Sequence, residues 1–150
     1  MHALYRVLAA LATLGALLAA LASPARASAE APGARALDWA EAHALNATYA
    51  WGGTGPAYDC SGIVSVALGH AGVSVPHSTY AMVGSWHLYR VYSPQRGDLA
   101  FWGSPSAPYH VEFVTAAPGW TFGAETYGWA GRVTWHSDRW FAPSAYYRVR

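Results

Sequence analysis

A chain of 150 residues, 53% of them hydrophobic, is long enough for one domain with its own core and leaves no room for a second domain. Its formal net charge of +1 gives no reason to expect a nucleic acid or another polyanion as partner. The single cysteine, Cys60, excludes a disulfide within the chain, so its thiol is free or pairs with another molecule.

The N-terminal segment has the pattern of a signal peptide. A positively charged start precedes a nearly unbroken Ala/Leu run over residues 7–22, which is shorter than the roughly 20 residues that a spanning helix needs. Small residues then offer cleavage sites after Ala27 or Ala29. An uncleaved anchor is the alternative. We predict a signal peptide over residues 1–29 and one mature domain over 30–150, located in the cell wall or secreted, with no membrane contact after cleavage.

Two helices are predicted before any long strand. Apolar residues recur near one face of residues 30–46, and a Gly-rich connector follows over 48–59. From 60 to 71 the apolar positions again follow a helical period, with Asp59 as a natural N-cap and Gly72 as a natural stop. Cys60 therefore belongs to the first turn of a buried helix.

The second half of the chain has the pattern of strands, after a loop with a short helix over residues 75–86. We predict strands over residues 99–103, 109–115, 120–126, 131–136 and 145–150. Pro118-Gly119 lies between the second and third of these, which predicts an antiparallel hairpin. Helices followed by strands indicate an α+β fold.

The chemistry of Cys60 depends on its place at a helix start. Unpaired N–H groups and the aligned peptide dipoles favour the reactive thiolate there. The carboxylate of Asp59 opposes the thiolate, unless its charge is used to cap N–H groups. A buried structural cysteine is the alternative, because cysteine is among the residues most often found inside proteins.

A nucleophilic cysteine needs a base, and His110 is the histidine that lies within an alternating strand. Glu112 shares its face, and on the partner strand of the hairpin Glu125 is suited to orient an imidazole. A solvated acid at the edge of the sheet is the alternative for Glu125. The other histidines of the mature domain are predicted to be structural or exposed, or are not placed: His43, His70, His77, His87 and His136.

A metal site is not predicted. The residues His110 and Glu112 form an H-x-E motif, which also begins the zinc deaminase signature, but the cysteines of that signature are absent downstream. No histidine pair has the four-residue spacing of H-E-x-x-H. We therefore expect neither a metal nor an organic cofactor.

Three stretches together carry a family resemblance: "YAWGGTGPAYDCSGIVSVALGHAGVSVPHST", "QRGDLAFWG" and "HVEFV". In this order, from about Tyr49 to Glu125, they resemble the NlpC/P60 family of papain-like cell-wall cysteine peptidases. The resemblance implies a small papain-like α+β domain, with the nucleophile helix packed on an antiparallel sheet. It also implies cleavage of amide bonds in peptidoglycan stem peptides, commonly the γ-D-glutamyl to diamino acid bond, without a cofactor. We expect a monomer.

The resemblance assigns roles position by position. Cys60 matches the nucleophile, which forms a thioester, and His110 matches the general base. Tyr49 matches the tyrosine near the oxyanion. Asp59 and Ser61 match flanking positions that contact substrate and form local hydrogen bonds.

Two departures concern the third catalytic group. The family usually has a histidine on the strand after the base, where this chain has Gly123. Glu125, two residues on, is on the same face. Glu112 stands where the family commonly has a small residue. Either glutamate is a candidate to orient His110, and without one the site is weakened or inactive.

Eight tryptophans suggest core and rim packing, while Trp51 and Trp129 are candidates for the walls of a substrate groove. Two other functions stay open. One is a catalytically silent module that binds the cell wall. The other is an acyl or peptidyl transferase on the same scaffold.

Overall fold

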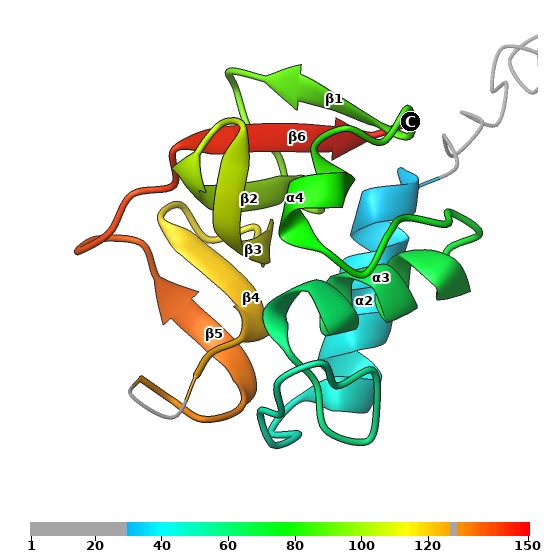
Figure 1. Ribbon diagram of the computed structural model, residues 1–150, viewed down its shortest axis with the longest axis vertical. Coiled ribbons are helices and arrows are strands. Elements are labelled where there is room, and N and C mark those ends of the chain that lie inside the picture. The colour runs from blue at the N-terminus through cyan, green and yellow to red at the C-terminus, as the bar shows by residue number, and fades with distance from the viewer. Residues whose placement is uncertain (1–29, 127–128) are drawn as a thin grey trace, which may run out of the picture.

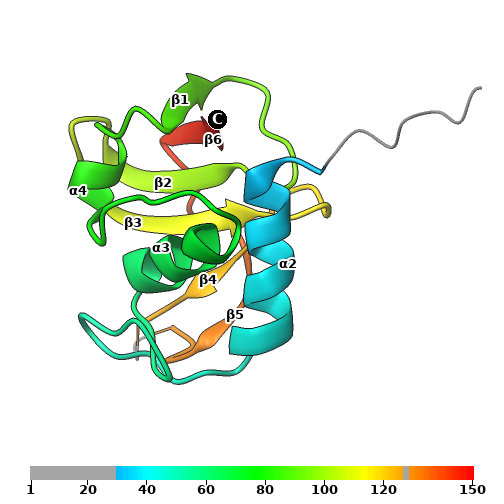
Figure 2. The same ribbon diagram turned by 90° about the vertical axis from the view of Figure 1, so that its right-hand side faces the viewer.

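A computed structural model describes residues 30–126 and 129–150, so the predicted signal peptide lies outside the described residues. The helices are α2 (Pro32–Ala44), α3 (Cys60–His70) and α4 (Thr79–Met82), and the strands are β1 (Leu88–Val91), β2 (Leu99–Ser104), β3 (Ala107–Val114), β4 (Trp120–Ala124), β5 (Val133–Ser137) and β6 (Ala145–Val149). Figure 2 shows α3 lying across β3 and β4 with α2 beside it. The helices thus cover one face of the sheet.

The sheet is antiparallel throughout, with strand order β1-β6-β2-β3-β4-β5 (Figure 1). The predicted α+β fold is confirmed, and so is the β3–β4 hairpin across Pro118-Gly119. β1 was missed. It is a four-residue edge strand in which only Leu88 is buried, so the alternation that marks a strand in sequence is absent. It is held by pairing with β6 at the far end of the chain.

The core forms where the helices meet the sheet. On α3, Ile63, Val64 and Leu68 are fully buried, and the strands contribute Phe113 and Phe122. Each such side chain contributes about 1.5–3 kcal/mol on burial. Both long helices are one or more residues shorter than predicted, because the apolar pattern runs past the last hydrogen-bonded turn.

The turn before β2 is tied to β6 by an ion pair in which Asp98 is buried and Arg148 is partly exposed. Arg148 on β6 donates to both oxygens of Asp98, from Nε and Nη2, each at 2.8 Å. The same carboxylate accepts from the backbone N–H of Gln95 at 2.7 Å. Bidentate pairs of this kind fix geometry as well as adding energy. The pair therefore positions β2, which lies beside the base-bearing strand β3.

Among the described residues, no helix has the length and apolar character needed to cross a bilayer.

Candidate active site

The nucleophile end of the site begins at Asp59, which caps α3. Its Oδ1 accepts from the backbone N–H of Gly62 at 2.7 Å, and its Oδ2 accepts from that of Gly52 at 2.8 Å. Both carboxylate oxygens of Asp59 therefore accept hydrogen bonds from backbone N–H groups. This is the condition under which its charge is not expected to disfavour the Cys60 thiolate. Cys60 follows directly, half-buried and free of any disulfide.

Glycines allow the connector to touch the start of α3. A Cβ on Gly62 would lie 1.9 Å from the carbonyl oxygen of Gly53, which is closer than any real side chain permits. The Asp59 backbone N–H donates to that same oxygen at 3.1 Å. The loop before the helix is thus fixed directly against the turn that carries Cys60.

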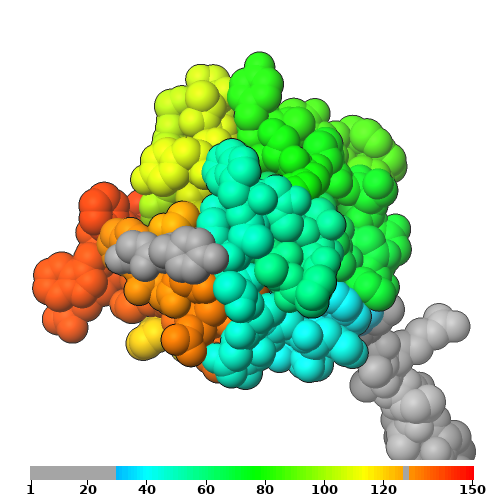
Figure 3. Space-filling view, turned by 60° about the horizontal axis from the view of Figure 1, so that its bottom comes forward, coloured from blue at the N-terminus to red at the C-terminus, as the bar shows by residue number. Residues whose placement is uncertain are grey.

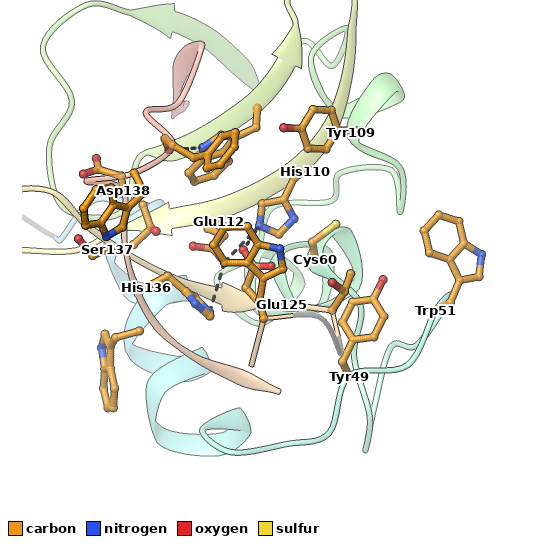
Figure 4. A pocket seen from close by; sticks show the side chains of 17 residues that line it. Tyr49, Trp51, Cys60, Tyr109, His110, Glu112, Glu125, His136, Ser137 and Asp138 are labelled. Carbon is orange, nitrogen blue, oxygen red and sulfur yellow. Dashed lines mark hydrogen bonds and ion pairs between the residues drawn. The ribbon is translucent and has the colours of Figure 1, made fainter. Parts of the chain in front are cut away.

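The base end of the site is His110 on β3. Its ring lies against Trp102 of β2, with ring centroids 5.2 Å apart, and its side chain is 13% exposed. In Figure 4 the Cys60 side chain lies next to the His110 ring, and the thiol forms a hydrogen bond with the imidazole. The predicted nucleophile and base are therefore neighbours in one pocket.

Two carboxylates meet the far side of the His110 ring. Nε2 lies 3.2 Å from Oε1 of Glu112 and 3.1 Å from Oε1 of Glu125 (Figure 4). Glu112 is almost completely buried, whereas the Glu125 side chain is 18% exposed. Both candidates for orienting the base are in contact with it.

Gly123 provides the space that Glu112 occupies. A Cβ on Gly123 would lie 2.6 Å from Cγ of Glu112 and 3.0 Å from its Cδ. A larger residue at 123 is incompatible with the observed position of Glu112. The Glu112 side chain from β3 therefore fills the room that Gly123 leaves on β4.

His136 on β5 is a site residue that the sequence did not reveal. It was predicted to be structural or exposed, but its Nε2 lies 3.5 Å from Oε1 of Glu112 and 3.4 Å from the Gly123 carbonyl oxygen. Pairing of β5 with β4 places it opposite Thr121. This register was not available from sequence, since the β4–β5 connection has no diagnostic turn.

The electrostatic environment favours a protonated His110 beside an ionised Glu125. Burial by itself lowers the pKa of His110, but hydrogen bonds with Cys60 and the two carboxylates outweigh it and raise that pKa to about 12. Burial opposes ionisation of Glu125, yet the hydrogen bond and positive charge of His110 lower its pKa. The imidazolium form is thus strongly stabilised.

Tyr49 lines the same pocket from the connector. Burial, together with the negative charges of Cys60 and Asp59, raises the pKa of its hydroxyl. The hydroxyl therefore stays protonated and retains a proton to donate.

Asp59 and Ser61 lie behind the nucleophile and outside the pocket lining. Ser61 is 7% exposed, and its hydroxyl donates to Oδ1 of Asp59 at 3.3 Å. The ring of His77 contacts the same oxygen through Nε2 at 2.8 Å. These side chains use their polar atoms on one another and on the helix cap.

An aromatic rim surrounds the pocket, a cavity of about 560 Å³. Figure 3 shows the connector (cyan) and the segment after β4 (orange) meeting on one face, with the segment before β6 projecting beside them. The rim residues are Trp51, Trp102, Tyr109, Trp129, Trp135, Trp140 and Phe141. Trp51 is 89% exposed and Trp140 is 80% exposed. Both are available to a ligand that enters the pocket.

The cluster of His110, Glu112 and Glu125 also has the composition of a metal site. One ligand atom from each residue lies within 4.8 Å of the others.

Comparisons with known proteins indicate one family. Residues 46–117 match the sequence model of the NlpC/P60 family. A stretch of 64 residues, 41% of the chain, is 39% identical to a probable endopeptidase of Mycobacterium tuberculosis. A stretch of 68 residues, 45% of the chain, is 35% identical to probable endopeptidase p60 of Listeria seeligeri. The chain spans only 17% and 13%, respectively, of the lengths of these relatives.

Solved structures give a match over most of the chain. The NlpC/p60 domain of the peptidoglycan hydrolase SagA is 30% identical and has a TM-score of 0.66, covering 79% of this chain and 98% of that domain. The peptidoglycan hydrolase RipB of Mycobacterium tuberculosis has a TM-score of 0.65 over 79% of this chain and 65% of its own. At 23% identity the second match supports the fold alone.

Proposed function

Because this chain belongs to the NlpC/P60 family, we propose that it is a cysteine peptidase that hydrolyses amide bonds in the stem peptides of peptidoglycan. The observation that carries the proposal is the convergence of Cys60 and His110 in one pocket (Figure 4), where the thiol forms a hydrogen bond with the imidazole. A thiol at a helix start beside a buried imidazolium is placed to react as the thiolate.

The chemistry proceeds by acyl transfer. The Cys60 thiolate attacks the amide carbonyl, and a carbon–sulfur bond forms as His110 gives its proton to the leaving amine. Water, deprotonated by His110, then hydrolyses the thioester and regenerates the thiol. The Cys60 backbone N–H and the Tyr49 hydroxyl donate to the oxyanion, and Tyr49 lines the same pocket as the thiol.

Glu112 and Glu125 orient the base. Both contact Nε2 of His110, which leaves its other ring nitrogen to serve the sulfur. A carboxylate in this position stabilises the imidazolium and fixes the ring orientation. His110 therefore has an orienting partner although residue 123 is a glycine.

The substrate assignment rests on the relatives. SagA, whose domain is 30% identical to this chain, is named a peptidoglycan hydrolase, and the mycobacterial and Listeria relatives are named probable endopeptidases. We assign the γ-D-glutamyl to diamino acid bond as the scissile bond, with Trp51 on the substrate side of the pocket. The protein acts as a monomer in the cell wall or outside the cell, after export by its predicted signal peptide.

The experiment is mass spectrometry of the fragments released from purified peptidoglycan of known stem-peptide composition. Expected products end in γ-D-glutamate and begin with the diamino acid. Products cut at another amide would revise the bond, and products joined to an added amine would indicate the transferase. If no fragment is released, the enzyme assignment fails.

Alkylation of the single cysteine separates the peptidase from a silent binding module. An ordinary thiol has a pKa of about 8.5, so an activated Cys60 reacts with iodoacetamide well below that pH. Denatured protein is the matched control, because it carries the same thiol without the site. Equal reaction rates for the folded and denatured protein would favour the silent module.

A further inference from the structure

The Nε2 atom of His110 is surrounded by more carboxylate oxygen than one proton can satisfy. Oε1 of Glu112 and Oε1 of Glu125 lie 3.2 and 3.1 Å from it, although an imidazole nitrogen carries at most one hydrogen. An orienting group for a catalytic base requires one carboxylate. The second carboxylate at Nε2 is therefore not required for orienting the base.

Glu112 adds an independent observation. The residue is 1% exposed, and its Oε2 has no hydrogen-bond partner among the described residues. Buried polar atoms in native proteins are nearly always paired with protein, water or an ion. An orphaned carboxylate oxygen in the pocket lining is therefore a place for a positively charged ligand.

The spacing of the donor atoms suits a metal ion. The three donors lie within 4.8 Å of one another, and the shortest separations, 3.1 and 3.2 Å, are near the edge length of about 3.4 Å in a tetrahedral zinc site with bonds of about 2.1 Å. One imidazole with two carboxylates suits zinc or cobalt. We propose that His110, Glu112 and Glu125 bind a divalent transition-metal ion of the zinc class, and that the bound ion inhibits the peptidase.

Inhibition follows from the atom that the metal occupies. A metal–nitrogen bond forms at Nε2 of His110, and the proton that Nε2 carried passes to water. The ring then holds a proton on Nδ1 alone, so the imidazolium that protonates the leaving amine no longer forms. This inhibitory effect rests on the proposed function, whereas the binding of the ion does not.

His136 supports the site from outside the three ligands. Its Nε2 contacts the Glu112 oxygen at 3.5 Å and the Gly123 carbonyl oxygen at 3.4 Å. Groups that hold a ligand in this way tune metal affinity without binding the ion. The metal site thus gives a role to His136, which takes no part in the proposed peptidase mechanism.

Titration of the full chain with Co²⁺ tests the site without reference to activity. We expect one ion per chain, with the visible absorption of a low-coordinate cobalt centre. The Cys60→Ala variant should bind with unchanged affinity, because the thiol is not a ligand. A thiolate-to-cobalt charge-transfer band, lost in Cys60→Ala together with the visible absorption, would overturn the proposed ligand set.

Variants of the carboxylates locate the ion. Glu112→Gln and Glu125→Gln should each weaken Co²⁺ binding at least tenfold. Asp138→Asn is the matched control, because Asp138 lines the same pocket outside the cluster and its loss should leave the affinity unchanged. If Glu112→Gln fails to fold, as judged by circular dichroism, the more exposed Glu125→Gln decides. Equal affinity in the wild type and Glu125→Gln would overturn the site.

Zn²⁺ then tests the inhibition. Release of stem peptides should stop at Zn²⁺ concentrations that saturate binding, measured by calorimetry, and should return on addition of a chelator. Undiminished release by the saturated enzyme would overturn the inhibitory effect. A chain that binds Co²⁺ as described but releases no fragments under either condition would refute the proposed function and leave the metal site standing.

Discussion

The two ends of the site are built in different ways. The nucleophile end comes mainly from one continuous stretch, 49–62, where backbone N–H groups bind the Asp59 carboxylate, and His77 adds a contact from outside the stretch. The base end is assembled from β3, β5 and the residue that follows β4, and its contacts join side chain to side chain across these segments. One end depends on local chain conformation and the other on strand register.

This difference determines how each end tolerates substitution. At the nucleophile end, the cap needs only a short side chain with an acceptor before the helix. At the base end, the Glu112 side chain and the absent side chain of Gly123 are complementary, so neither position changes alone without steric or electrostatic cost. Substitutions at the two ends should therefore differ in their effects on activity and stability.

The largest effect is expected at the nucleophile. Cys60→Ala should lower the release of stem-peptide fragments by about 10⁴-fold or more, because no other group forms the thioester. Fragment release is measured by mass spectrometry, and thermal unfolding serves as the control for folding. Activity within tenfold of the wild type would remove Cys60 from the mechanism.

The nucleophile end was predictable because its signals are local. An N-cap aspartate, glycines in the connector and an apolar helical period stand next to one another, and each keeps its meaning without knowledge of the rest of the fold. The helix that starts at Cys60 and the cap at Asp59 were therefore predicted at the positions observed.

The base end was predictable only in part. Alternation along one strand placed His110 and Glu112 on one face, and the hairpin brought Glu125 nearby. The complementarity of Glu112 with Gly123 needs atomic distances, and the contact of His136 needs the β4–β5 register. Sequence alone therefore indicated Glu112 and Gly123 as two separate features, where the structure shows that the two residues fit each other.

The second prediction compares the two carboxylates. Glu112→Gln should lower kcat by about 10²-fold, since the buried carboxylate is the stronger stabiliser of the imidazolium. Glu125→Gln should lower kcat by about tenfold, because its carboxylate is more exposed to water. Steady-state kinetics with a soluble stem peptide measure both, in the presence of a chelator. A larger effect at Glu125 would assign the orienting role to this residue, which follows β4, instead of Glu112 on β3.

The third prediction concerns packing at the base end. Gly123→Ala should lower the free energy of unfolding by about 1–3 kcal/mol, because its Cβ would lie 2.6 Å from Cγ of Glu112. Gly69→Ala is the matched control, because a Cβ at this position on α3 would meet no atom within 4 Å. That variant should raise the free energy of unfolding by about 0.5–1 kcal/mol. Denaturant unfolding measures both.

The same steric argument predicts coupling. In the Glu112→Ala background, Gly123→Ala should cost less than it does in the wild type, because the two nearest atoms, Cγ and Cδ of Glu112, are gone. Additive effects of the two substitutions would show that the cost arises elsewhere on β4.

The fourth prediction tests the cap at the nucleophile end. Asp59→Ala should lower the free energy of unfolding by about 1–2 kcal/mol, because the N–H groups of Gly52 and Gly62 lose their acceptor. Asp59→Asn should cost less, since its amide oxygen still accepts one of these bonds. Equal losses for the two variants would assign the effect to the charge and not to the cap.

The smallest effect is expected from the ionisation of Glu125. Its folded pKa lies below the ordinary value of 4.5, because the hydrogen bond and charge of His110 outweigh burial. A depressed pKa contributes stability that is present above the unfolded value and is lost as pH falls through the folded value. The wild type should therefore exceed Glu125→Gln in unfolding free energy by about 1 kcal/mol near neutral pH, and the difference should close as the pH falls below 4.5. Denaturant unfolding of both proteins across this range, with a chelator present, measures the difference. A difference that widens on acidification would mean that burial, and not His110, dominates at this carboxylate, and that the base end holds its charge through Glu112 alone.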